Sequence, residues 1–149
     1  MPIHSKAKTK IDELPHNLLS KPAMDLQLRN IRSICARFPE AHEDRLQDRP
    51  MFHVRRRRFA ILNSETLPYR KRWATSGDSL HFATDEQLRT TLRSDVFYSS
   101  PHHGFRGWRA TKLTTETNWA EIARLLEGAY RSVASKELIA ELDKVTDDS

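Results

Sequence analysis

Cysteine is almost absent from this sequence, and so are glycine and long apolar stretches. The 149 residues include one cysteine, Cys35, and four glycines. A single cysteine excludes an internal disulfide and a zinc site built from cysteines, and it fits a reducing, cytoplasmic setting. No apolar stretch approaches the roughly 20 residues that span a bilayer, and the first residues lack the apolar core of a secretory signal. We therefore expect a soluble protein that is not exported and has no membrane partner.

Signatures of catalysis are missing as well. The sequence has no glycine-rich phosphate-binding loop, no nucleophile elbow and no pair of carboxylates on one helix face. The adjacent histidines His102 and His103 would need a third ligand that the spacing does not supply, so no metal site is expected. The polar stretch at residues 42–44 is interpreted as a solvated loop. We expect neither an enzyme nor a bound cofactor.

Positive charge is what the chain has in excess, and it is concentrated in the middle third. The formal net charge is +5; residues 51–113 carry 12 Lys and Arg against 5 Asp and Glu, whereas residues 114–149 carry 4 against 8. A basic block beside an acidic end suits a protein with one face for nucleic acid or an acidic partner. Basic proteins without such a partner are common, so charge alone does not decide the function.

Four consecutive arginines, Arg55–Arg58, are the most informative local feature. They lie between two apolar stretches, residues 51–54 and 59–62, that have the character of strands. This arrangement predicts a hairpin with guanidinium groups at or near its tip, where they project into water. Guanidinium groups are shaped for phosphate or carboxylate, so the tip is interpreted as a site for a polyanion. The alternative is a solvated turn that keeps an aggregation-prone edge apart.

Length and composition predict a single domain. The 38% of hydrophobic residues are enough for one modest core. Residues 1–19 have little periodicity and are interpreted as a mobile arm, residues 20–143 as the domain and residues 144–149 as a tail. A monomer is the favoured state.

Periodicity and capping signals predict the elements of this domain. The helices are expected at residues 20–38, at 85–93 after a capping box of Thr84 and Gln87, and from Asn118 to about 142 with an interruption at Ser135. Further strands are expected at residues 69–74, 80–83 and 108–113. Cys35 falls on the apolar stripe of the first helix and is expected to be a small buried hydrophobe. Together these elements indicate an α+β fold, a mainly antiparallel sheet with helices packed on one face.

Aromatic side chains are interleaved with the basic ones between residues 73 and 108. They could form a platform on which unpaired bases stack, made of Trp73, Phe97, Tyr98, Phe105 and Trp108. A place in the core is the favoured interpretation of Trp73, Phe105 and Trp108. Tyr98 is the aromatic residue most expected to be exposed.

Several short motifs follow one another in a familiar order. They are Phe38-Pro39-Glu40, Glu43, Phe59-Ala60, Phe82, Gly107-Trp108 and the run Gly128–Lys136. In this order the chain, from Met24 to Leu142, resembles the MmcQ/YjbR family of small bacterial proteins. The resemblance implies a YjbR-like α+β domain whose sheet has been likened to a double-wing DNA-binding arrangement. Members of that family usually have a glycine-containing turn and one lysine where this chain has Arg55–Arg58, and the arm before Met24 is additional.

DNA is the first candidate partner. Its phosphates would supply most of the affinity through nine basic residues, namely Arg55, Arg56, Arg57, Arg58, Arg70, Lys71, Arg72, Arg106 and Arg109. Neither a helix-turn-helix nor a zinc finger is visible, so low sequence specificity is expected. For residues 70–72, a strand edge protected by charge is an equal alternative.

The second candidate is a small interaction module without catalysis. It would bind an acidic protein surface or a small anionic ligand in a cleft between sheet and helices. The surface discriminates between the two candidates. A continuous positive stripe broader than a duplex favours DNA, and a concave pocket that holds one or two arginines favours the interaction module.

Overall fold

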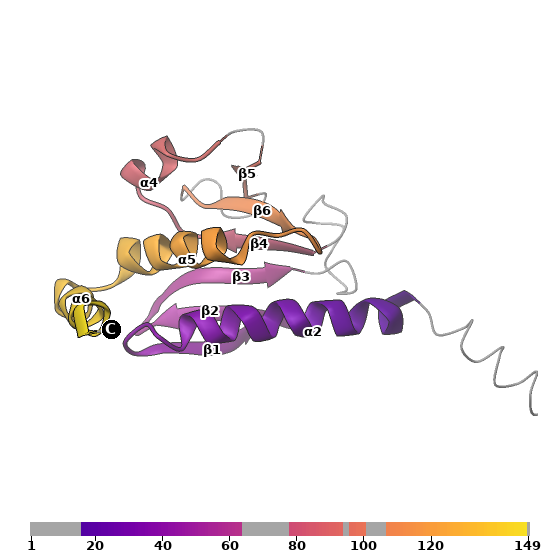
Figure 1. Ribbon diagram of the computed structural model, residues 1–149, viewed down its shortest axis with the longest axis horizontal. Coiled ribbons are helices and arrows are strands. Elements are labelled where there is room, and N and C mark those ends of the chain that lie inside the picture. Colours follow the sequence, from indigo (N-terminus) through magenta and orange to yellow (C-terminus); the bar gives the residue numbers. More distant parts are fainter. Residues whose placement is uncertain (1–15, 64–77, 94–95, 101–106, 149) are drawn as a thin grey trace, which may run out of the picture.

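A six-stranded antiparallel sheet organises the chain, with the strand order β1-β2-β3-β4-β6-β5 (Figure 1). The computed structural model describes residues 16–63, 78–93, 96–100 and 107–148. The strands are β1 (Ala41–Leu46), β2 (Arg49–Val54), β3 (Arg57–Asn63), β4 (Asp78–Phe82), β5 (Tyr98–Ser99) and β6 (Arg109–Leu113). The helices are α2 (His16–Cys35), α4 (Glu86–Thr90), α5 (Trp119–Val133) and α6 (Lys136–Asp148). The predicted α+β fold with a mainly antiparallel sheet is confirmed.

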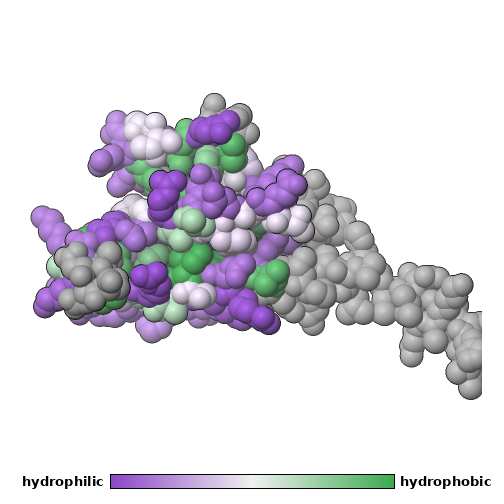
Figure 2. Space-filling model, viewed as in Figure 1, coloured by the Kyte–Doolittle hydropathy of each residue, from purple (hydrophilic) through white to green (hydrophobic). Residues whose placement is uncertain are grey.

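Two long helices cover one face of this sheet. Figure 1 shows α2 and α5 side by side on the same face, where α5 packs on β3 and β4 and α2 contacts β1 and α5. Hydrophilic side chains cover much of the outer surface of this layer, with smaller hydrophobic patches between them (Figure 2). The helices are therefore amphipathic, and the core lies between them and the sheet. Within the described ranges, no helix is both long enough and apolar enough to cross a bilayer.

The start and the end of α5 follow the predicted capping signals. The Asn118 side chain accepts hydrogen bonds from the backbone N–H groups of Ala120 and Glu121, at 3.1 and 3.3 Å. At the other end Ala134 is extended, and the Ser135 hydroxyl accepts a hydrogen bond from the backbone N–H of Leu138, at 3.3 Å. These contacts satisfy backbone groups that a helix end leaves open. The predicted cap and the predicted break at residue 135 are both confirmed.

The first strand corrects the prediction of a solvated loop at residues 42–44. β1 pairs with β2 along its whole length, from Ala41 opposite Val54 to Leu46 opposite Arg49. The four residues between its ends are exposed, so the strand shows no apolar alternation. It is an edge strand held by its backbone ladder and by an ion pair between Arg32 of α2 and Glu43, at 2.5 Å. A two-residue turn with positive φ at both positions joins it to β2.

Three helices differ from the predicted ones in their bounds or caps. α2 begins at His16 and ends at Cys35, whereas a start at residue 20 and an end at 38 were expected. α4 is capped by Asp85, whose carboxylate accepts from the Leu88 backbone N–H at 2.7 Å, and not by Thr84. The Thr84 hydroxyl donates instead to the Gly107 carbonyl, which joins the end of β4 to the start of β6. α6 continues to Asp148, through most of the stretch interpreted as a tail.

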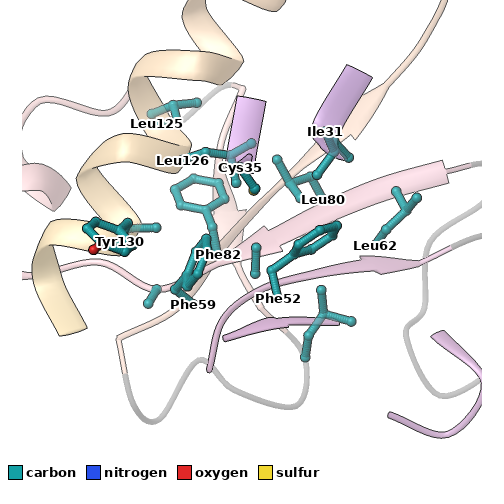
Figure 3. Packing of buried hydrophobic residues seen from close by; sticks show 14 of the residues in the cluster. Ile31, Cys35, Phe52, Phe59, Leu62, Leu80, Phe82, Leu125, Leu126 and Tyr130 are labelled. Carbon is teal, nitrogen blue, oxygen red and sulfur yellow. The ribbon is translucent and has the colours of Figure 1, made fainter. Parts of the chain in front are cut away.

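An aromatic cluster ties the β2–β3 hairpin to the helices. The ring of Phe59 lies edge-on to the rings of Phe38 and Tyr130, with centroids 6.2 and 5.7 Å away. Figure 3 shows Phe59 and Tyr130 among the apolar side chains between α5 and the sheet. The Tyr130 hydroxyl donates to the Pro39 carbonyl at 2.7 Å, so its polar end is satisfied. The strand that carries the arginines is thus anchored directly behind them.

Burial of Cys35 gives the folded domain a defined response to alkaline pH. As predicted, the thiol is buried in the core, and desolvation raises its pKa from 9.0 to about 12. Above pH 9 the unfolded chain loses this proton and the folded chain keeps it, so stability falls as the pH rises from about 9 toward 12. Tyr130, whose pKa burial raises to about 12, acts in the same direction. Urea unfolding between pH 8 and 10.5 should show this loss as a fall in the free energy of unfolding with rising pH. The fall should be shallower in Cys35→Ala, and an equal fall in both proteins would contradict the prediction.

Candidate anion-binding site

The arginine run forms the tip of the β2–β3 hairpin, as predicted. Arg55 and Arg56 are the two turn residues, and Arg57 and Arg58 are the first residues of β3. Val54 pairs with Arg57 across the turn, and Arg55 adopts a positive φ of 54°. All four side chains are exposed. The hairpin therefore presents them to solvent from a rigid base.

Arg55 turns away from its three neighbours toward Glu40. Its Nε and Nη2 atoms donate to the two carboxylate oxygens of Glu40, at 3.2 and 3.4 Å. These hydrogen bonds hold the pKa of Glu40 below its usual range. Both side chains are about half exposed, so the pair adds little stability, but it occupies the guanidinium with a carboxylate of the protein itself. Arg55 thus belongs to a separate, charge-compensated contact.

The other three arginines line a pocket at one end of the sheet. It has a volume of about 430 Å³ and is formed where β3 begins, β4 ends, β6 begins and α5 ends. In Figure 1 these four ends lie together on the side of the molecule that carries α6. We call it the arginine pocket, and its lining residues are Arg56, Arg57, Arg58, Ala83, Thr84, Trp108, Ser132 and Val133.

The charge of the arginine pocket is positive and uncompensated by its described walls. None of the described lining residues is acidic. Among the parts of the chain that the structure describes, no carboxylate forms an ion pair with Arg56, Arg57 or Arg58. The carboxyl end of α5 also reaches the pocket at Ser132 and Val133, and its dipole disfavours an anion by about 0.3–1 kcal/mol. Charge-assisted hydrogen bonds from the three arginines to an anion, each contributing about 1.5–3 kcal/mol, would outweigh that term.

Two more arginines lie beside the pocket and bind its backbone. Arg89 donates to the carbonyl and the hydroxyl of Thr84, at 3.3 and 3.1 Å. Arg109 donates to the carbonyls of Gly107 and Trp108, at 3.4 and 3.2 Å. Gly107 has a φ of +88°, and a Cβ at this position would collide with the Arg89 guanidinium. These contacts fix the wall between β4 and β6 and add positive charge near it.

The predicted site residues have different outcomes. Arg56, Arg57 and Arg58 come together in one pocket, Arg109 lies beside it, and Arg55 is paired elsewhere. The other four, Arg70, Lys71, Arg72 and Arg106, lie outside the described residues. The same holds for the predicted strand at 69–74 and for Trp73, Phe105, His102 and His103. Within the described segments, no group of three His, Cys, Asp or Glu side chains could hold a metal ion.

The described aromatic residues belong to the interior. Phe97 and Trp108 are buried in the core cluster, which confirms the core interpretation for Trp108. Tyr98, expected to be exposed, is half-buried, with its ring edge-on to that of His81 at 6.4 Å. His81 itself is fully buried between the hydroxyls of Ser79 and Ser100, at 2.9 and 3.0 Å. A stacking platform for bases is therefore not formed by these side chains.

Sequence reasoning missed the residues that complete the pocket. The sequence predicts a helix cap at Thr84, and it places Ser132 and Val133 in the run Gly128–Lys136 of the terminal helix. Neighbouring positions in the sequence give no signal that these residues meet Arg56–Arg58. The run from Gly128 to Lys136, which includes Ser132 and Val133, was the one sequence feature that pointed to these pocket residues.

Comparisons with known proteins support the fold and leave the activity open. No protein-family model matches the chain. No curated protein matches it either. Its structure is similar to the crystal structure of Deinococcus radiodurans protein DR2400, which carries a DUF419 domain, with a TM-score of 0.55 and 20% identity over 78% of this chain and 87% of that one. At this level of identity the likeness shows the fold alone, an α+β domain with helices packed on an antiparallel sheet.

Proposed function

We propose that this protein is a non-catalytic binding module for a small anionic ligand, which it holds in the arginine pocket. The observation that carries the proposal is the convergence of Arg56, Arg57 and Arg58 on one pocket of about 430 Å³ without an acidic residue among its described walls. A concave site with a few converging polar groups is the usual form of a small-ligand site. This arrangement favours the interaction module over a flat nucleic-acid surface.

The chemistry of the ligand follows from the guanidinium groups. Each presents up to five N–H donors in a planar fork that fits two oxygens of a phosphate or a carboxylate. Because Phe59 anchors the hairpin to Tyr130, the backbone that carries the arginines is held in place before the ligand arrives. Preorganisation of this kind reduces the entropy lost on binding. The ligand is therefore an organic or inorganic anion with phosphate or carboxylate groups.

Isothermal titration calorimetry tests the proposal with three probes: inorganic phosphate, tripolyphosphate and citrate. At least one probe is expected to bind with a stoichiometry of one. The variant Arg56→Ser, Arg57→Ser, Arg58→Ser should weaken that binding by about 1,000-fold or more, since each lost charge-assisted bond costs about 1.5 kcal/mol or more. Folding should be unaffected because the three side chains are exposed.

A charge-matched variant provides the control. Arg29, Arg37 and Arg124 are also exposed and lie on α2, after α2 and on α5. Changing these three to serine removes the same net charge and should leave the affinity within about threefold, the scale of a screened long-range effect. If none of the probes binds at millimolar concentration, or if both variants lose binding equally, the proposal is wrong.

DNA binding is the second candidate, and the exposed hairpin tip favours it. Arg56–Arg58 are consecutive and exposed, as groups that contact successive phosphates would be. The finer family assignment is also a proposal. We propose membership of the MmcQ/YjbR group on the basis of the sequence motifs and the DUF419 neighbour, and a reducing cytoplasmic setting on the basis of the single cysteine.

A further inference from the structure

We infer that the ligand of the arginine pocket is a compact oligophosphate, with at least two phosphoryl groups joined to each other. This inference rests on the proposed function and narrows its ligand class. Three properties of the described walls carry it: their charge, their hydrogen-bonding groups and the size of the space between them.

The charge of the pocket exceeds what one phosphate group can match. Arg56, Arg57 and Arg58 bring three positive charges. Arg89 and Arg109 add two more next to the wall formed by Thr84, Gly107 and Trp108. A single phosphate group carries about −1.5 to −2 at pH 7, so a second phosphoryl group is needed to balance the three lining arginines alone. A single carboxylate carries one negative charge and balances even less of the positive charge of the pocket.

The hydroxyl groups in the wall have no hydrogen left for a ligand. Ser132 donates to the Ala129 carbonyl at 2.7 Å. Thr84 donates to the Gly107 carbonyl and accepts from Arg89. The charged side-chain donors in the described lining are the three guanidinium groups, and they require acceptors. An oligophosphate is made almost wholly of acceptor oxygens, whereas a ligand rich in hydroxyl or amino groups would leave its own donors unmatched.

The size and lining of the space favour a compact polar ligand larger than one phosphate. The volume of about 430 Å³ falls within the range of roughly 300–1,000 Å³ typical of sites for small organic ligands and cofactors. Inorganic phosphate, with five non-hydrogen atoms, would leave most of it to water. The apolar lining residues are Ala83, Trp108 and Val133, and the first two are nearly inaccessible, so they offer little surface to a ring.

A phosphate series tests the inference on the full chain. Phosphate, pyrophosphate and tripolyphosphate are titrated at one fixed ionic strength in a buffer free of divalent cations, with citrate and a short oligothymidylate as further arms. Pyrophosphate and tripolyphosphate should bind at one site, each at least about tenfold more tightly than phosphate, and more tightly than citrate or the oligothymidylate. The Arg56–Arg58 serine variant should lose this preference, and the variant at residues 29, 37 and 124 should keep it.

The outcomes separate the inference from the proposed function. If phosphate binds as tightly as tripolyphosphate, or if citrate does, the pocket is an anion site and the oligophosphate inference is overturned. Tighter binding of the oligothymidylate overturns it as well, because the recognised phosphates are then those of a nucleic-acid backbone. If no anion binds to the wild-type chain, the proposed function and the inference fail together.

Discussion

Replacement of Trp108 by alanine is expected to destabilise the domain by about 3–5 kcal/mol, the usual cost of removing a large aromatic side chain from a core. Trp108 is 7% exposed and belongs to the hydrophobic cluster that includes both α5 and the sheet. Because typical domains have only about 5–15 kcal/mol of stability, this loss would remove a large share of it. Urea denaturation, followed by circular dichroism, measures the change directly.

A second tryptophan in the same chain gives the matched control. Trp119 begins α5 and is only partly buried, so Trp119→Ala should cost clearly less than Trp108→Ala. Trp108→Phe keeps an aromatic ring and should retain most of the stability, which allows binding to be measured on a folded chain. If Trp108→Ala unfolds at the same urea concentration as the wild type, Trp108 contributes only to the wall of the pocket and the core assignment is wrong.

The elements that the sequence predicted well are those whose buried residues follow a regular apolar pattern along the chain. β2 and β3 have continuous apolar segments, and α5 has an asparagine cap followed by an apolar stripe. In each case the local signal and the tertiary packing favour the same structure. β1 gave no such signal, because its residues do not alternate between apolar and polar and its position depends on pairing with β2. Its turn at Gln47 and Asp48 has positive φ without the usual glycine.

The sequence predicts a chemistry for the candidate site, the binding of an anion, but it does not predict the shape of the site. The arginine run indicated an anion partner because no packing argument accounts for four guanidinium groups at a hairpin tip. The sequence does not show which of the four arginines are available to a ligand, because Arg55 pairs with Glu40, which lies 15 residues away. The pocket itself joins β3, β4, β6 and α5, so its walls come from residues up to 77 positions apart, from 56 to 133.

The pairing of Arg55 with Glu40 makes a sharp prediction for DNA binding. Each phosphate contact on duplex DNA contributes about 0.9 to the slope of log affinity against log salt. If the hairpin tip binds DNA, serine at 56, 57 and 58 should flatten this slope by up to about 2.7, the sum of three contacts, for DNA of any sequence. Arg55→Ser should change it little, because that guanidinium already binds a carboxylate. Fluorescence anisotropy with a labelled duplex across a salt series measures both slopes.

Glu40→Gln completes the test, because it removes the carboxylate that occupies Arg55. If Arg55 is withheld from DNA by this pair, the Glu40 variant should bind DNA more tightly and with a slope steeper by up to about 0.9, one additional phosphate contact. A large decrease in the slope of log affinity against log salt in Arg55→Ser alone would show instead that the Arg55–Glu40 pair opens when DNA binds. No binding by the wild type at about 50 mM salt and micromolar protein, where non-specific DNA-binding proteins normally associate, would reject DNA as the partner. The three remaining arginines would then act only through the pocket, where the phosphate series decides their ligand.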